Sequence, residues 1–279
     1  MPDKRLALVT GGTSGVGLAL VRHLAANGFV VHFIGTNTDR GRRVEGELGA
    51  HTGRFVQLDL SDLGAVRNFA DGFAEQHEQL DLLANVAGVL LPKRAVTADG
   101  IEKTLAIGHF APFVLTSGLV PSLSQADHAR VVNVSGSARG IMTPSLDFTD
   151  LNLERRYNAA RAAVAAVHSK TVMTQIWAER LADNGIDVNA FHPGLVRSGL
   201  GRHLPWYLRG PFRLGQPLLS PRSRSGEHVC TSEAVTGTTG HLFTGTRGRP
   251  LAFSPDYTQR VWDWTTQTVE SADVGQRRV

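Results

Sequence analysis

A glycine-rich turn near the N-terminus constrains the fold more than any other stretch of this chain. Leu6 to Val9 is a short apolar run that predicts a buried strand, and it leads directly into the turn. After the turn, apolar residues recur at helical spacing until Asn27-Gly28, which predicts the end of a helix. The turn contains Gly11, Gly12, Gly15 and Gly17. Without Cβ atoms, its backbone N–H groups can approach a pyrophosphate, so the pattern predicts a dinucleotide site. The alternative is a tight strand-helix connection with no ligand.

Length and composition favour one large α/β domain spanning residues 1–279. With 279 residues, of which 42% are hydrophobic, the chain can bury one substantial core. Cys230 is the only cysteine, so we expect neither a disulfide framework nor a metal site built from thiolates. No run of 18 apolar residues occurs, and the first predicted strand leaves no room for a signal peptide. We therefore expect a cytoplasmic protein with no integral membrane span. The net charge of +4 comes without a recognised nucleic-acid-binding module, so we expect no nucleic-acid partner.

The residues after the second predicted strand indicate which dinucleotide would bind. Phe29 to Ile34 predicts this strand, and its carboxyl end should meet the adenosine ribose. An acid there would hold the ribose hydroxyls of NAD, whereas small polar or basic residues leave room for the extra phosphate of NADP. The strand tip carries no acid and is followed by Thr36, Asn37 and Arg40. The sequence therefore favours NADP over NAD. The alternative is that the arginines here only form the solvated face of the next helix.

Two further strands are predicted, and each is followed by polar residues. They span Arg54 to Leu58 and Leu80 to Ala84. Strands and helices that alternate at this spacing predict a Rossmann-type, doubly wound parallel sheet with helices on both faces. Asp59, Asn85 and Gly88 then lie at carboxyl ends of strands, where ligands bind in such sheets. Asp59 can also belong to a helix-capping turn, and we expect Ser61 to cap the following helix.

These motifs resemble those of the short-chain dehydrogenase/reductase family, and the resemblance covers nearly the whole chain. The matching motifs are Thr10-Gly11-x-x-x-Gly15-x-Gly17, Asp59-Leu60, Asn85-Val-Ala-Gly88, Arg130-Val-Val-Asn-Val-Ser135 and His192-Pro-Gly-Leu-Val-Arg-Ser198. Within the family the chain looks most like the retinol-dehydrogenase-like branch. Features of that branch are echoed by Gly108-His109-Phe110, His168-Ser169-Lys170 and Thr239-Gly-His-Leu-Phe243. The resemblance implies a Rossmann-type fold and an NAD(P)-dependent oxidoreductase.

The resemblance also implies cofactor roles for particular residues. The glycine turn would line the pyrophosphate, Asp59 would meet the adenine, and Asn85 and Gly88 would border the adenosine pocket. Lys170 would hold the nicotinamide ribose, and residues 193–198 would lie beside the nicotinamide. The expected cofactor contacts are Gly11, Thr13, Ser14, Gly15, Val16, Gly17, Thr36, Asn37, Arg40, Asp59, Leu60, Asn85, Ala87, Gly88, Lys170, Pro193, Gly194, Val196 and Ser198.

The chain departs from the family at the residues expected to carry out the chemistry. Family members place a Tyr proton donor four residues before the Lys, on the same helical face, and an Asn anchors a water relay. Here Lys170 is present, but Ala166 stands at the Tyr position and Leu105 at the Asn position. Tyr157 lies thirteen residues before Lys170, too far for the same helical turn. We therefore expect Tyr157 to be structural.

The serine that orients the carbonyl in the family is displaced as well. Its expected position is Gly136, which is flanked by Ser135 and Ser137. Side chains alternate along a strand, so a neighbouring serine points the wrong way unless the glycine marks a bulge, in which case Ser137 could take the role. The candidate catalytic residues are thus Lys170, Ser137 and Ser135, an incomplete Ser-Tyr-Lys triad. His109, His192 and Tyr207 are further titratable residues near the expected site, each with a structural alternative.

Residues 195–226 are predicted to form a lid over the substrate. Between Pro193 and Gly226 the chain has no Asp or Glu, and six arginines interleave with apolar residues. In the family the corresponding segment closes over the substrate. A basic, aromatic cover suits a hydrophobic small-molecule substrate that carries an acidic group, or an anionic membrane surface. The alternative is a solvated loop that arginine keeps soluble.

The leading prediction is an atypical NADP(H)-dependent oxidoreductase that acts on a hydrophobic carbonyl, alcohol or activated double bond. Two alternatives remain open: a redox-neutral isomerase, cyclase or lyase on the same fold, and a non-catalytic cofactor-binding regulatory protein. All three interpretations are compatible with a chain that keeps Lys170 and the glycines but lacks the tyrosine proton donor. Two long helices, expected at about 100–118 and 157–184, could pair in a homodimer, as they often do in the family.

Overall fold

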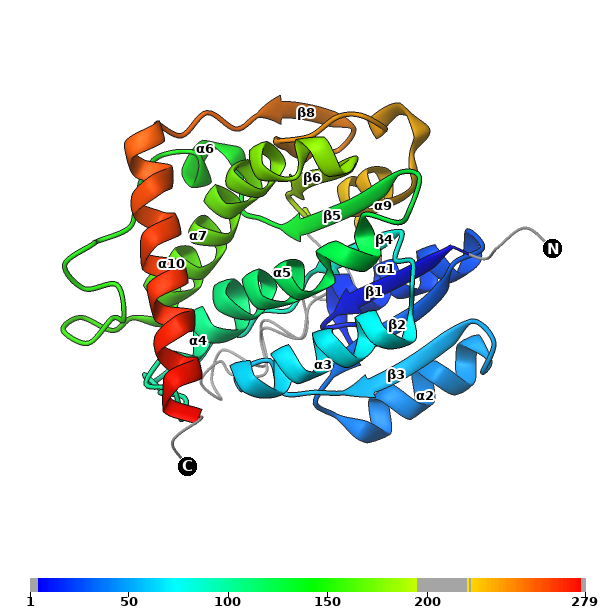
Figure 1. Ribbon diagram of the computed structural model, residues 1–279, viewed down its shortest axis with the longest axis horizontal. Coiled ribbons are helices and arrows are strands. Elements are labelled where there is room, and N and C mark those ends of the chain that lie inside the picture. The colour runs from blue at the N-terminus through cyan, green and yellow to red at the C-terminus, as the bar shows by residue number, and fades with distance from the viewer. Residues whose placement is uncertain (1–4, 195–219, 221, 277–279) are drawn as a thin grey trace.

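The computed structural model describes residues 5–194, 220 and 222–276 of the chain (Figure 1). The strands are β1 (Leu6–Thr10), β2 (Val30–Gly35), β3 (Gly53–Gln57), β4 (Leu82–Asn85), β5 (Ala129–Val134), β6 (Ile186–Phe191), β7 (His241–Thr244) and β8 (Arg247–Pro250). The α-helices are α1 (Gly15–Ala26), α2 (Thr38–Leu48), α3 (Leu63–Gln76), α4 (Lys103–Leu105), α5 (Ala111–Leu123), α6 (Ala138–Ile141), α7 (Ala159–Arg180), α9 (Arg224–Thr231) and α10 (Pro255–Gln276). A π-helical turn η1 (Ala106–Phe110) and the 3₁₀ turns η2 (Ala182–Asn184) and η5 (Glu233–Val235) complete the described elements.

The strands form one eight-stranded sheet in the order β3-β2-β1-β4-β5-β6-β7-β8. All neighbouring strands are parallel except β7 and β8, which form an antiparallel hairpin at the edge. The predicted doubly wound parallel sheet is therefore confirmed. After β3 the chain crosses back to place β4 beside β1, so the strand order reverses between these two strands. This switch point opens a crevice at their carboxyl ends, where such folds bind ligands.

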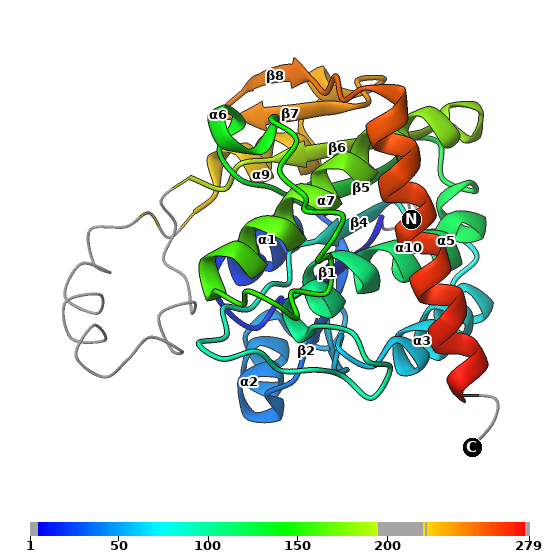
Figure 2. The ribbon, with the colours of Figure 1, turned by 90° about the vertical axis from the view of Figure 1, so that its left-hand side faces the viewer.

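Two hydrophobic cores lie on opposite faces of the sheet. On one face, α1, α2 and α9 cover the strands, and α1 contributes the buried Leu20, Val21 and Leu24. On the other face, α3, α5 and α7 pack on the strands, with α10 lying across the outside of α7 and α3 (Figure 2). The glycine turn therefore belongs to a framework of three layers, in which the sheet lies between two layers of helices.

The C-terminal helix α10 is held to the body by aromatic rings. Trp262 packs edge-on against Phe113 of α5 and Trp177 of α7, and the Arg180 guanidinium lies 3.6 Å from the centre of the Trp262 ring. The helix runs without a break from Pro255 to Gln276. The chain's own C-terminal helix thus covers part of the face of α5 and α7 on which a homodimer is predicted.

The segment Lys103–Leu123, made of α4, η1 and α5, is the one candidate membrane span in the described part of the chain, judged by length and mean hydropathy. Within the fold, 72% of its apolar window is buried, as in the core helix of a globular protein. The π-helical turn η1 interrupts it at Ala106–Phe110, beside α7. Such turns are frequent at functional sites because they shift the side chains that follow.

One local prediction is wrong. Asp62, not Ser61, caps α3: its Oδ1 accepts the N–H of Ala65 at 2.9 Å, while the Ser61 hydroxyl donates to Asp59 Oδ1 at 2.8 Å. The last strand is Arg247–Pro250. Leu251 and Phe253 are buried in the core, whereas the edge strand before them is fully exposed. The apolar residues therefore lie in the connection after the strand, and this connection packs into the core.

Candidate cofactor and active site

A cleft of about 400 Å³ opens at the switch point between β1 and β4. Its walls come from the glycine turn, the carboxyl ends of β1 to β5, the α4–η1 segment and α7. It is lined by Gly11, Thr13, Ser14, Gly15, Val16, Gly17, Ile34, Gly35, Thr36, Leu58, Asp59, Leu60, Val86, Ala87, Gly88, Val89, Thr104, Ile107, Gly108, Val134, Ser135, Ala163, Ala166, Val167, Lys170 and Pro193. The cleft thus brings together most of the residues predicted to bind the cofactor.

Close backbone packing makes two glycines of the turn difficult to replace. A Cβ atom on Gly17 would lie 2.3 Å from the carbonyl oxygen of Gly11. Gly11 itself has a φ of +69°, and a Cβ there would meet the Cα of Ala87 at 3.0 Å. Only glycine fits this contact between the turn, α1 and the end of β4. The cradle at the start of α1 therefore fits the pyrophosphate of a dinucleotide.

Thr10 fixes the position of the turn relative to β4. Its buried hydroxyl accepts the backbone N–H of Val86 at 2.9 Å and that of Ala87 at 3.0 Å. The hydroxyl thereby satisfies two donors beyond the end of β4 and holds the cleft wall against the glycine turn. Thr10 belongs to the first motif of the sequence but is absent from the predicted cofactor contacts. Its position at the end of a buried strand, directly before the first glycine, is the signal that could have identified it.

The predicted adenine end of the cleft carries one ionised side chain. Asp59 lines the cleft, and its Oδ1 also accepts the backbone N–H of Ser61 at 2.9 Å, in a turn before α3. Its Oδ2 lies 3.7 Å from the Lys103 ammonium. Partial burial raises the pKa of Asp59, but the hydrogen bonds from Ser61 and the charge of Lys103 outweigh it and leave the pKa below its usual value.

Several predicted cofactor residues lie outside this lining. Asn37 caps α2, where its Oδ1 accepts the N–H of Arg40 at 2.9 Å, and neither residue lines the cleft. Asn85 is fully buried and donates its side-chain N–H to Asn133 Oδ1 at 3.0 Å, so only its backbone faces the site. Gly194 is exposed and does not line the cleft. Val196 and Ser198 lie outside the described residues.

The other end of the cleft, which we call the reaction end, is built around Lys170. This lysine is only 2% exposed, and its Nζ donates to the backbone oxygen of Asn85 at 3.3 Å. Burial lowers the pKa of Lys170 to about 7. Ala166 lies one turn earlier on α7, also lines the cleft, and faces Gly108 of η1, where an added Cβ would come within 2.9 Å of the Ala166 Cβ.

The two candidate serines occupy different environments. Ser135 lines the cleft and is buried, but its hydroxyl is hydrogen-bonded to the Thr171 hydroxyl at 2.7 Å. Ser137 is exposed at the N-terminus of α6 and lies outside the lining. Ser135 is therefore the serine that the fold places at the cleft.

The other titratable candidates make contacts elsewhere. Tyr157 donates its hydroxyl to the backbone oxygen of Leu91 at 2.7 Å and does not line the cleft. His109 is buried behind the site, where its Nε2 is hydrogen-bonded to Thr265 at 2.8 Å and burial lowers its pKa to about 3. His192 does not line the cleft either, and Tyr207 lies outside the described residues. Among the residues that line the described cleft, Asp59 and Lys170 are the only ionisable ones.

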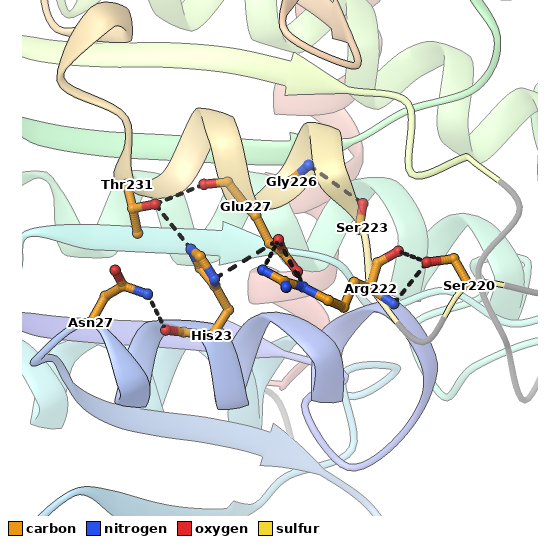
Figure 3. A network of polar contacts seen from close by, with 8 residues as sticks. All are labelled: His23, Asn27, Ser220, Arg222, Ser223, Gly226, Glu227 and Thr231. Carbon is orange, nitrogen blue, oxygen red and sulfur yellow. Dashed lines mark hydrogen bonds and ion pairs between the residues drawn. The ribbon is translucent and has the colours of Figure 1, made fainter.

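The chain on both sides of the predicted lid is fixed near the cleft. Ser223 donates its hydroxyl to the backbone oxygen of Pro193 at 3.2 Å, which joins the two flanks. Arg222 makes a two-pronged contact with Glu227, and His23 of α1 is hydrogen-bonded to Thr231 of α9 at 2.9 Å (Figure 3). The end of the predicted lid, from Arg224, is the start of α9, and residues 195–219 and 221 lie outside the described part of the chain.

Comparison with known proteins agrees with this geometry. The family model for short chain dehydrogenases matches residues 5–205. Retinol dehydrogenase 12 from Homo sapiens is 32% identical over 275 residues, which cover 94% of this chain and 85% of that protein. An uncharacterised protein from Mycobacterium paratuberculosis superimposes with a TM-score of 0.69 at 25% identity, covering 95% of this chain and 93% of the other.

A metagenomic short-chain oxidoreductase solved in complex with NADP superimposes with a TM-score of 0.56 at 26% identity. That match covers 69% of this chain and 83% of the other. The fold thus agrees with the sequence matches. The chain belongs to the short-chain dehydrogenase/reductase family, in its retinol-dehydrogenase-like branch.

Proposed function

We propose that this protein is an NADP(H)-dependent oxidoreductase that acts on a hydrophobic carbonyl, its alcohol or an activated double bond, without a tyrosine proton donor. One observation carries the proposal: a single cleft joins the glycine cradle to the reaction end, where Lys170 stands among apolar side chains and Ala166 lies one turn before it on α7. The cleft therefore combines a site for the cofactor with space for an apolar substrate.

NADP(H) would be held by this chain's own residues along the length of the cleft. The glycine cradle would bind the pyrophosphate, Asp59 would meet the adenine, and Lys170 would hold the nicotinamide ribose beside Pro193. When bound, the reduced cofactor supplies a hydride to the substrate.

The preference for NADP rests on the end of β2. Gly35 and Thr36 line the cleft there, and residues 35–38 include no acid that would hold the ribose hydroxyls of NAD. Arg40 lies in the first turn of α2, close behind in the sequence. The related metagenomic enzyme is an NADP complex, which supports the same preference.

The substrate class follows from the walls around Lys170. The side chains there are mostly apolar and come from the β4–α4 connection, η1 and α7: Val89, Ile107, Ala163, Ala166 and Val167. Apolar walls favour an apolar substrate through burial of surface, at roughly 25 cal/mol per Å² removed from water. The human relative is named for retinol, which is a hydrophobic alcohol.

The proposed lack of a tyrosine donor is supported by where the two described tyrosines lie, while Tyr207 is outside the described residues. Tyr157 is committed to the Leu91 backbone, and Tyr257 is hydrogen-bonded to His168 Nε2 at 2.8 Å, beneath α10. Neither lines the cleft. The position one turn before Lys170 therefore has no hydroxyl to give, and the reaction proceeds with a different proton source.

The experiment starts with fluorescence titrations of the purified protein with NADPH and NADH. We expect tighter binding of NADPH, followed by its oxidation when aromatic and aliphatic ketones and enones are added. Turnover without net NADPH oxidation would favour the redox-neutral alternative. Binding without any turnover would favour the non-catalytic one, and failure to bind either cofactor would contradict the whole proposal.

Replacing Ala166 tests the role of the missing hydroxyl directly. Ala166→Tyr should raise the turnover number by about 10²- to 10⁴-fold, the usual contribution of a positioned general acid. Ala166 lines the cleft of about 400 Å³, which gives the added ring a space to enter. Ala166→Phe is the matched control because it adds the ring without the hydroxyl. An equal effect of both substitutions would show that the ring, and not the proton donor, limits turnover.

A further inference from the structure

Lys170 is unusual among the charged residues of this protein because it is buried without an acidic partner. Its single hydrogen-bond acceptor is the backbone oxygen of Asn85, which leaves the other protons of the ammonium group available toward the cleft. No carboxylate forms an ion pair with it anywhere in the described part of the chain. Burial without a counter-charge lowers the pKa of the amine to about 7.

The groups that face Lys170 from the neighbouring elements are nearly all uncharged. The strands β4 and β5 present Asn85, Asn133 and Ser135, and η1 presents His109. Burial, aided by the charge of Lys170, lowers the pKa of His109 to about 3, so this imidazole is neutral at physiological pH. Among the described residues at the reaction end, Lys170 is therefore the one whose charge changes near neutral pH.

Asn85 fixes the position of the amine. Its side chain donates to Asn133, which in turn donates to Thr174 Oγ1 at 3.0 Å, one turn after Lys170 on α7. This buried chain of hydrogen bonds ties β4, β5 and α7 together behind the amine. With Ala166 one turn before Lys170 and the Ser135 hydroxyl bonded to Thr171, the described lining of the cleft holds no other side-chain acid between Lys170 and the apolar walls.

We infer that Lys170 is itself the proton donor and acceptor of the reaction, in place of the tyrosine that it assists elsewhere in the family. In reduction, the substrate carbon gains the hydride while its oxygen takes a proton from the Lys170 ammonium, which leaves a neutral amine and an alcohol. The amine then regains a proton from solvent. In oxidation, the neutral amine accepts the hydroxyl proton as the hydride leaves. The inference rests on the proposed function and names the residue that completes it.

Two substitutions separate a proton donor from a group that only positions the cofactor. Lys170→Met keeps an unbranched apolar stem but carries no proton. Lys170→Arg keeps the positive charge and the hydrogen-bond donors but does not release a proton in proteins. If Lys170 is the donor, both variants should lose at least about 100-fold in kcat. Lys170→Arg should retain NADPH affinity more closely than Lys170→Met.

The pH profile gives a second signature. Reduction by the wild type should slow as the pH rises through about 7, because the ammonium form is the donor. The variants should lack this falling limb. If either variant keeps the wild-type kcat and pH profile, the inference is overturned while the proposed function stands. If the wild type oxidises no NADPH with any substrate of the panel, the proposed function itself is overturned.

A stability measurement tests the same group without turnover. The pKa of Lys170 is lower in the folded protein than in the unfolded chain, so the unfolded chain binds more protons between about pH 7 and the ordinary lysine pKa. The cofactor-free wild type should therefore gain unfolding free energy as the pH rises from about 7 to about 9.5. Relative to it, Lys170→Met should show a flatter dependence in denaturant titrations. Parallel curves would show an ordinary lysine and would overturn the inference.

Discussion

The two ends of the cleft are built in different ways. The glycine cradle depends on the backbone: Gly17 touches the Gly11 carbonyl, Gly11 needs a positive φ, and the Thr10 hydroxyl holds two N–H groups beyond β4. The reaction end depends on single side chains, chiefly Lys170 and the small residue at position 166. A substitution in the cradle therefore disturbs the fold, whereas a substitution at the reaction end changes the chemistry and leaves the fold intact.

Under the proposed function, this difference explains how a chain can keep the cofactor framework without the usual donor. Alanine is a strong helix former, so position 166 can lack a large side chain without disturbing α7, where it lies against Gly108. The same freedom does not exist in the glycine turn, because no added atom fits there. The cradle is thus the more constrained half of the site, and three predictions test that comparison.

The largest effect is expected for Gly17→Ala. The added Cβ would meet the Gly11 carbonyl oxygen at 2.3 Å, so the turn must move away from its position in the cradle. We expect NADPH affinity to fall at least about 100-fold, close to 3 kcal/mol of binding free energy, together with a lower melting temperature. Fluorescence titration and thermal unfolding measure both.

Gly72→Ala is the matched control for this substitution. Gly72 lies within α3, has an ordinary helical φ, and an added Cβ there would meet no atom within 4 Å. Alanine at this position should leave NADPH affinity unchanged and raise stability by up to about 1 kcal/mol. If Gly17→Ala bound NADPH as tightly as this control, the cradle would be no more constrained than an ordinary helix.

Thr10→Val is expected to have an intermediate effect. Valine has a methyl group in place of the threonine hydroxyl. The shape of the side chain is kept, but the N–H groups of Val86 and Ala87 lose their acceptor. The unfolding free energy should fall by about 1–3 kcal/mol, the usual cost of buried donors that lose their partner. Affinity for NADPH should fall with it, because the same N–H groups belong to the wall of the cleft. Urea titration and cofactor titration give the two values.

Thr10→Ser provides the control for Thr10→Val. Serine keeps the hydroxyl and loses only the methyl group, so it should retain most of the cofactor affinity. If Thr10→Val lost stability while keeping full affinity, the end of β4 would support the fold without shaping the cofactor site.

Much of the fold and of the cradle could be predicted from the sequence because short-range patterns encode them. The strand before the glycines and the helix after them are local, and the alternation of strands and helices leaves the parallel sheet as the natural arrangement. The position of Asp59 and Gly88 at one cleft follows from that topology, since the carboxyl ends of parallel strands share one edge.

The inward or outward direction of single side chains could not be predicted in the same way. Asn85 points toward Asn133, 48 residues later in the chain, and its side chain does not line the cleft. This choice depends on a partner that is distant in the sequence, so local spacing carries no signal for it. Asn37 instead caps α2 through the N–H of Arg40, three residues on, which is a local pattern.

The smallest effects are expected at the start of α3, where two adjacent polar residues have separate tasks. Asp62 caps the helix through the Ala65 N–H, so Asp62→Ala should cost about 1 kcal/mol of stability without changing NADPH affinity. Ser61 instead holds the Asp59 carboxylate that lines the adenine end. Ser61→Ala should weaken NADPH binding by about threefold, since one hydrogen bond to a cleft residue contributes about 1 kcal/mol or less.

Urea and cofactor titrations of both variants separate the two roles. If Asp62→Ala weakened binding more than Ser61→Ala did, the cofactor end would depend on the helix as a whole and not on the local contact to Asp59.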